Sequence, residues 1–158
     1  MTAYVIDTNI ALYLLEGVPE VVTFMEHLAK DSSAVILFSV ITKMEMYSSP
    51  LVATEAHRQD VDSVLAIAHE VLDVDDHIAA TCGELRQLCT SQPGEECPTC
   101  HRRSQGKLKA ANAIIAATGV TEGALLVTRN VKDFATLMDA GRLRVINPFA
   151  QAQLSVGG

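Results

Sequence analysis

The chain has 158 residues, the size of one domain with a buried core, and its 49% hydrophobic content excludes a disordered protein. Its 12 Lys and Arg against 19 Asp and Glu give a formal net charge of -7, and it has three Tyr, four Phe and no Trp. This composition argues against nucleic-acid binding by the whole surface or by aromatic stacking. No stretch approaches the roughly 20 apolar residues of a membrane span, and Met1–Ala3 lacks the basic start of a signal peptide, so we expect a cytoplasmic protein without membrane contact.

The first predicted strand, Tyr4–Ile6, is followed directly by Asp7 and precedes the apolar helical stretch Ile10–Leu15. This pattern predicts a buried strand that feeds a strand-to-helix turn, the place where open α/β sheets keep their sites. We expect Thr8 and Asn9 to accept bonds from the free amides of the helix, with Asp7 fixed beside its N-terminus. The alternative is that Asp7 only helps to cap this helix.

The next stretch predicts a second helix and a second buried strand. Pro19 suits the first position of an amphipathic helix, and Ala34–Phe38 is a continuous apolar run, typical of a strand covered on both faces. Ser39 suits the cap of a helix in which Glu45 lies about two turns beyond the strand end. A second acidic group is therefore expected near the same edge of the sheet as the first.

The rest of the chain continues this alternation. We expect Asp75 or Asp76 and Asn130 to cap two of its helices. The remaining predicted elements are a helix within 51–70, a strand over 71–74, helices over 76–89 and 108–118, a strand over 124–127, a short helix after 130 and a strand over 143–146. Strands alternating with helices predict a single three-layer α/β/α domain over 1–158 with a mainly parallel central sheet.

An irregular, Cys-containing insertion is predicted at about 90–106, where the composition changes to Pro, Gly, Glu, Ser and Cys. Cys97 and Cys100 form a Cys-x-x-Cys turn, which in a cytoplasmic protein favours zinc or a redox pair over a structural disulfide. With Cys89 and His101 they supply four ligands for a structural Zn²⁺. Free thiols, or a disulfide formed during handling, are the alternatives because there is no second Cys-x-x-Cys.

The densest basic stretch of this acidic chain follows the Cys-x-x-Cys turn. It includes Arg102, Arg103 and Lys107, and Arg129 lies after a later predicted strand. These side chains could guide an RNA backbone toward the acidic groups. A solvated loop, or a contact with an acidic partner protein, is the alternative interpretation.

Four motifs, in their order and spacing, resemble PIN-domain nucleases, specifically the VapC-type toxins of prokaryotic toxin-antitoxin pairs. The motifs are Val5–Asn9, Ser39–Glu45, Ala111–Ala117 and Val127–Phe134. The resemblance covers essentially the chain from Tyr4 to Pro148 and implies a PIN-like fold. It also implies homodimers, and a cognate antitoxin whose chain occupies the active-site groove.

The resemblance implies a divalent-metal-dependent ribonuclease that hydrolyses RNA phosphodiester bonds with Mg²⁺ or Mn²⁺. Carboxylates gathered at one edge of a sheet repel one another and become tolerable when they share a hard cation. The positions matched to the family's metal-binding and catalytic cluster are Asp7, Glu45, Asn112 and Asp133. Asn9 and Thr128 are expected to be polar support.

Asn112 departs from the family pattern, which has Asp at the start of its Asp-x-x-Ile-Ala-Ala helix. An amide oxygen still ligates a cation, but it lacks the charge that favours the ion and acidifies its water. We therefore expect slow or undetectable cleavage from the chain as written. Two origins of Asn112 fit the sequence. It is either a natural variant or a deliberate Asp-to-Asn change that allows a toxic nuclease to be produced.

Two other functions compete with the nuclease. A haloacid-dehalogenase-like phosphatase also has an Asp after its first strand, but it needs a second Asp two residues later as general acid, where this chain has Asn9. A noncatalytic PIN-fold module that binds an antitoxin-like protein or RNA is the main alternative. The loss of one ligand disables chemistry more readily than it disables a binding surface.

Overall fold

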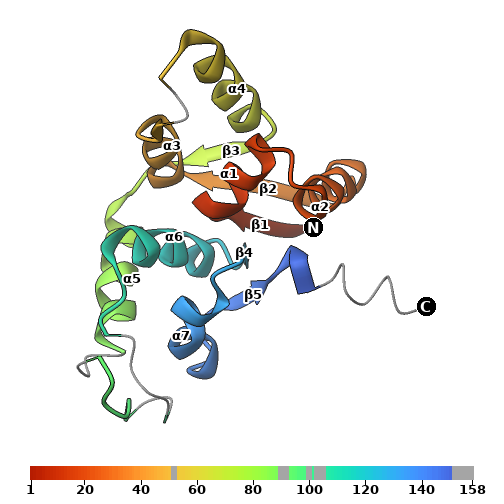
Figure 1. The fold of residues 1–158 in the computed structure, drawn as a ribbon. Helices are drawn as coiled ribbons and strands as arrows, with labels where there is room; N and C mark the ends of the chain where they lie inside the picture. The colour runs from red at the N-terminus through yellow and green to blue at the C-terminus, as the bar shows by residue number, and fades with distance from the viewer. Residues whose placement is uncertain (51–52, 89–92, 99–100, 102–105, 151–158) are drawn as a thin grey trace.

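The computed structural model describes residues 1–50, 53–88, 93–98, 101 and 106–150. Five parallel strands form the central sheet in the order β3-β2-β1-β4-β5 (Figure 1). The strands are β1 Thr2–Ile6, β2 Ala34–Ser39, β3 Glu70–Leu72, β4 Leu125–Val127 and β5 Arg144–Ile146. The predicted α/β fold class is confirmed, and the sheet is entirely rather than mainly parallel.

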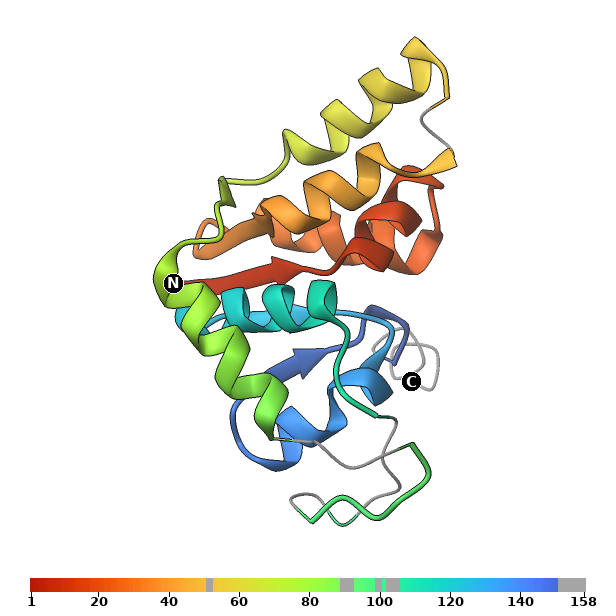
Figure 2. The same ribbon diagram turned by 90° about the vertical axis from the view of Figure 1, so that its left-hand side faces the viewer.

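Helices cover both faces of this sheet (Figures 1 and 2). The first face packs against α1 Thr8–Leu15, α2 Pro19–Lys30, α3 Val40–Tyr47 and α4 Glu55–Leu65. The second packs against α5 Asp76–Gln87, α6 Ala110–Thr121, the 3-10 turn η2 Val131–Phe134 and α7 Ala135–Asp139. The predicted three layers are therefore present.

Side-chain alternation along the strands explains the two cores. Ile6 and Phe38 contribute to the core under α1 to α4, whereas their neighbours Val5 and Leu37 contribute to the core under α5 to α7. Successive residues of a strand point to opposite faces, so a strand covered on both sides must be apolar at every position. The continuous apolar runs of the sequence have this cause.

Local capping sets several helix starts. The Ser39 side chain accepts a bond from the backbone N–H of Ile41 at 3.2 Å, and Asp75 accepts one from Ile78 at 2.7 Å, so both predicted caps are confirmed. Asn130 occupies the predicted N-cap position of η2, but its side chain forms no cap bond. Its backbone N–H instead donates to Thr128 Oγ1 at 3.1 Å, which turns the chain into η2.

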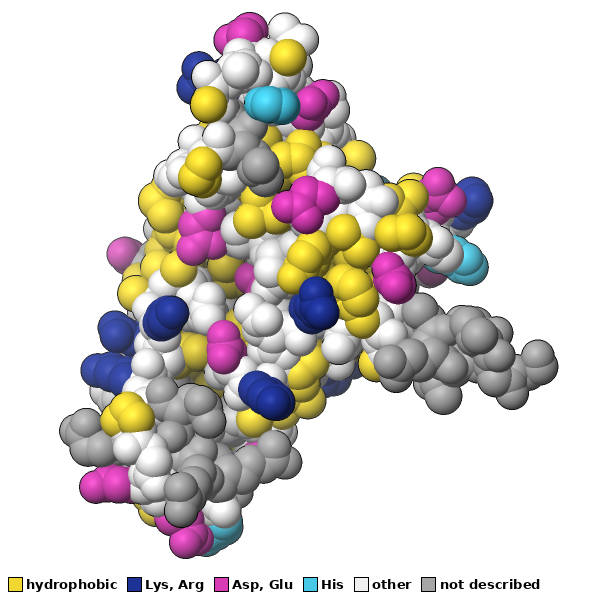
Figure 3. Space-filling view, viewed as in Figure 1, with side chains coloured by type: hydrophobic (Ala, Val, Ile, Leu, Met, Phe, Trp, Pro, Cys, Tyr) yellow, Lys and Arg dark blue, Asp and Glu magenta, His cyan; other side chains and the backbone are white. Residues whose placement is uncertain are grey.

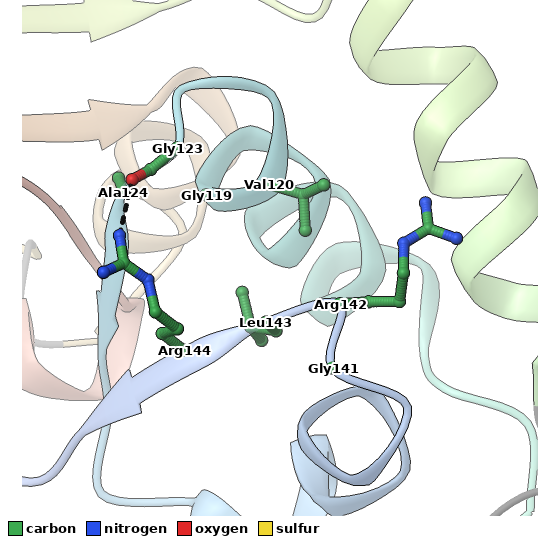
Figure 4. Close-up of a pocket in the computed structure, with 8 residues that line it drawn as sticks. All are labelled: Gly119, Val120, Gly123, Ala124, Gly141, Arg142, Leu143 and Arg144. Atoms are coloured by element: carbon green, nitrogen blue, oxygen red, sulfur yellow. Dashed lines mark hydrogen bonds between the residues drawn. The ribbon is translucent and has the colours of Figure 1, made fainter.

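The surface in Figure 3 carries acidic and basic side chains interspersed with apolar ones. Among the described residues, no helix is long and apolar enough to cross a membrane. A hollow of about 160 Å³ lies between the end of α6 and the start of β5, at the amino edge of the sheet (Figure 4). There the Arg144 guanidinium donates to the carbonyl oxygen of Gly123 at 2.8 Å.

Candidate active site

Asp7 lies at the carboxyl end of β1 and is the N-cap of α1. Its Oδ1 accepts the backbone N–H of Thr8 at 2.8 Å, and its Oδ2 accepts from Thr128 Oγ1 at 2.6 Å and from Asn9 Nδ2 at 2.9 Å. The prediction that Thr8 and Asn9 cap the helix is wrong, because the Asp7 N–H pairs with the carbonyl oxygen of Val127 at 3.0 Å. That bond keeps Asp7 extended, so the helix begins at Thr8.

The Asp7 carboxylate is costly to keep charged, because the residue is only 4% exposed. Burial raises its pKa above the ordinary value, and the charge of Glu45 raises the pKa further. The hydrogen bonds from Thr128, Thr8 and Asn9 lower the pKa and offset only part of the rise. A cation placed against Asp7 would favour its charged form.

Glu45 is held beside Asp7 by a side chain from α1. The Thr8 hydroxyl donates a short hydrogen bond to Glu45 Oε2 and lies 3.3 Å from the hydroxyl of Thr42, which is fully buried. Thr42 and Glu45 are three residues apart and share one face of α3. Thr8 is therefore a bridge between the two acidic positions, a role that the sequence analysis missed.

Asn112 and Asp133 form a second pair. Asn112 lies in the first turn of α6, Asp133 lies in η2, and Asn112 Nδ2 donates to Asp133 Oδ2 at 3.3 Å. Because α6 runs back along the sheet to the start of β4, its first turn lies at the carboxyl edge, where β1, β2 and β4 end. Both pairs are therefore at the edge where open α/β sheets keep their sites.

The donor set suits a hard cation, because it consists of carboxylate and amide oxygens. Asp7 Oδ1 accepts the hydrogen bond from the Thr8 amide and has a second lone pair that a cation can use. In the described part of the chain, however, no three His, Cys, Asp or Glu side chains come close enough to hold an ion. The Asn112 amide is part of the reason, because position 112 would contribute another carboxylate to the cluster if it were Asp. A single four-residue metal site stays a prediction.

The sequence profile of the PIN domain matches residues 4–137. The chain belongs to the PIN-domain family. The predicted resemblance to VapC-type PIN domains is thereby confirmed at the level of family and fold, since the similar solved structures include VapBC complexes. No curated protein sequence matches the chain significantly.

Three solved structures illustrate this likeness. VapBC2 from Rickettsia felis, bound to a promoter DNA fragment, has a TM-score of 0.68 at 23% identity and covers 92% of this chain and 98% of its own. FitAcB from Neisseria gonorrhoeae has a TM-score of 0.65 at 22% identity, with the same two coverages. A toxin-antitoxin complex from Klebsiella pneumoniae has a TM-score of 0.61 at 28% identity, covering 92% of this chain and 97% of its own.

The two described members of the predicted basic group differ in how they are held in this PIN domain. Lys107 is exposed three residues before α6. Arg129 is also exposed, and its backbone N–H donates to Asn9 Oδ1 at 3.3 Å, next to Asp7. Arg102 and Arg103 lie outside the described residues, so their predicted contact with RNA stays a prediction.

Half of the predicted zinc ligands lie outside the described residues, namely Cys89 and Cys100. Of the other two, Cys97 is fully buried and His101 is exposed, with His101 Nδ1 3.5 Å from Glu96 Oε1. The His101 backbone N–H donates to the Cys97 carbonyl oxygen at 2.8 Å, and His101 has a φ of 54°. Structural zinc therefore stays a prediction.

Proposed function

We propose that this PIN domain is a divalent-metal-dependent endoribonuclease, the toxin component of a toxin-antitoxin pair. One observation carries the proposal: a buried carboxylate, Asp7, has its pKa raised by burial and by a second carboxylate, Glu45, at the carboxyl edge of the sheet. Perturbed carboxylates in such a position are characteristic of functional sites. A hard cation is the partner that would make both charges favourable.

Asp7 and Glu45 would hold Mg²⁺ or Mn²⁺ from one side, with Asp133 and the amide oxygen of Asn112 on the other. When bound, such an ion activates a water and stabilises the departing oxygen of the phosphodiester. Thr128 and Asn9 orient the Asp7 carboxylate through Oδ2, and Oδ1, which accepts the Thr8 amide, would be the oxygen available to hold the ion. These roles follow from the hydrogen bonds of the chain itself.

Asn112 weakens this site in two ways. It supplies no charge, and its amide N–H donates to Asp133 Oδ2, which satisfies that oxygen without a cation. This bond favours the second candidate function for the chain as written, a noncatalytic PIN-fold module that binds an antitoxin-like protein or RNA. We expect cleavage by the present sequence to be slow or undetectable.

A cognate antitoxin, an RNA substrate and a homodimer complete the proposal. The antitoxin is supported by similar solved structures described as a toxin-antitoxin complex and as a member of the VapBC family of toxin-antitoxin systems, whose matched chains are covered to 97% and 99%. Magnesium, manganese and the RNA substrate are supported by the family and by the oxygen donors of the site. The dimer is supported by family resemblance.

The test is cleavage of a panel of single-stranded and folded RNAs in Mn²⁺ or Mg²⁺. Asn112→Asp should raise the rate by about 10² to 10³ over the present chain, by analogy with the loss of other electrostatic stabilisers. Adding Asp7→Ala should abolish the gain. An Asn112→Asp protein that is folded and binds the metal, yet cuts no RNA, would leave the noncatalytic module as the function.

A further inference from the structure

Arg129 is held in a fixed position by two aromatic rings from distant parts of the chain. Its guanidinium carbon lies 5.4 Å from the ring centroid of Tyr13 and 4.6 Å from that of Phe149, and Nη1 donates to the Tyr13 hydroxyl at 3.0 Å. The two rings pack edge to face with centroids 5.6 Å apart. Both cation–π distances are within the range of about 6 Å in which the attraction is significant.

The same residue is tied to the candidate active site through its backbone. The Arg129 N–H donates to Asn9 Oδ1, and Asn9 Nδ2 donates to Asp7 Oδ2 at 2.9 Å. The Asn9 side chain therefore connects the Asp7 carboxylate to the backbone of Arg129. The distance from the acidic groups to the cation is set by rigid elements, β4 on one side and α1 on the other.

The positive charge of Arg129 is not neutralised by an acidic side chain in the described part of the chain. Within the described residues, Arg129 forms no ion pair with a carboxylate, and pairs such as His101 with Glu96 and Arg142 with Glu84 do not involve it. Arg129 is also absent from the groups that shift the pKa of Asp7. A guanidinium has five N–H donors in a planar fork, so the bond to Tyr13 leaves donors for an outside acceptor.

We infer that Arg129, positioned by Tyr13 and Phe149, is a phosphate-binding subsite for the RNA backbone beside the acidic site. The inference rests on the proposed function for the identity of the ligand. A planar, preorganised guanidinium suits a phosphate bidentately and loses little side-chain entropy on binding. The subsite places one backbone phosphate next to Asp7 without reading the base, since phosphate contacts position a strand and carry no sequence information.

Tyr13 and Phe149 are positioning residues in this assignment. Phe149 follows β5 and covers one side of the guanidinium, and Tyr13 in α1 contacts it through both its ring and its hydroxyl. They bring together segments that are more than a hundred residues apart. RNA binding by Arg129 therefore depends on rings that do not themselves need to contact RNA.

The test measures binding of a fluorescently labelled single-stranded RNA to the full chain by anisotropy, in EDTA, over a series of salt concentrations. Arg129→Gln should weaken binding about tenfold, the value of a charged hydrogen bond, and should lower the slope of log K against log salt by about 0.7, the value for one phosphate on a single strand. Phe149→Leu should weaken binding by a few-fold, and Phe149→Tyr should restore it.

Arg144→Gln is the matched control, because Arg144 is an exposed Arg at the opposite edge of the sheet (Figure 4). It changes the net charge equally and should leave both the affinity and the salt slope as in the parent. The subsite is overturned if the Arg129 and Arg144 variants behave alike, or if the parent binds no RNA at low salt. An Arg129→Gln protein that binds RNA normally but loses an acidic partner protein overturns it as well.

This readout separates the subsite from the nuclease. EDTA prevents cleavage, so weakened RNA binding by Arg129→Gln supports the subsite even if Asn112→Asp cuts nothing. Conversely, cleavage by Asn112→Asp together with unchanged binding by Arg129→Gln removes the subsite and leaves the nuclease in place. Urea unfolding of each variant shows whether the variant is still folded. An unfolded variant would have a lower affinity for RNA without the predicted change in the salt slope.

Discussion

Asn112→Asp should make the metal-free protein less stable and its stability responsive to Mg²⁺. The Asn112 amide now donates to Asp133 Oδ2 at 3.3 Å, and the substitution would replace that bond with two facing carboxylates. Two like charges at about this separation repel by about 1 kcal/mol in a water-like environment, which applies because Asp133 is exposed. The lost hydrogen bond adds about 0.5 kcal/mol.

Urea unfolding in EDTA should therefore show a free energy of unfolding about 1 to 2 kcal/mol below that of the parent. Mg²⁺ at about ten times its dissociation constant should return about 1.4 kcal/mol, since only the folded state holds the ion. Asn112→Ala is the matched control: it removes the bond and adds no charge, so its loss should be smaller and Mg²⁺ should restore little of it. Equal behaviour of the Asp and Ala variants, with and without Mg²⁺, would refute a cation site shared by Asp133 and position 112.

Three further predictions concern the other parts of the site. Asp7 has a raised pKa in the folded state, so its contribution to stability is present below its unfolded value of about 3.9 and is lost as the pH rises through the folded pKa. In EDTA, Asp7→Asn should therefore gain stability relative to the parent as the pH rises above about 4, and a stability difference that stays constant with pH in thermal unfolding would contradict the assigned cause. Thr8→Val should cost about 1 kcal/mol in urea unfolding through the lost bond to Glu45, with Thr8→Ser close to the parent. Phe134→Ala should cost about 3 to 5 kcal/mol, because Phe134 is fully buried beside Asp133, and a cost below 1 kcal/mol would show that η2 is not anchored by this ring.

The elements of the fold could be predicted because their signals are local. A continuous apolar run followed by Ser39 or by Asp75 specifies a covered strand or a helix start within a few residues, and both caps are as predicted. The start of α1 was misplaced by one to two residues, since Asp7, Thr8 and Asn9 are all cap-type residues. The bond from the Asp7 N–H to Val127 decides among them, and that partner lies 120 residues away.

The connections within the candidate site could not be predicted for the same reason. The resemblance named Asp7 and Glu45, but the Thr8 hydroxyl that joins them acts across 37 residues. Likewise, Arg129 was predicted only as one of several basic side chains that could guide an RNA backbone, because nothing near it in the sequence indicates that Tyr13 and Phe149 would hold its guanidinium. Such contacts depend on the packed sheet and not on any local pattern.

We propose that Asp7, Glu45, position 112 and Asp133 share a hard cation at the carboxyl edge of the sheet. Crystals of the Asn112→Asp protein soaked in Mn²⁺ and measured at a wavelength where manganese scatters anomalously would locate the ion directly. We predict an anomalous peak at ligand distance from Asp7 Oδ1, with carboxylate oxygens from the second pair completing the shell. A well-ordered crystal with no peak beside Asp7, or with manganese bound only elsewhere, would contradict the account.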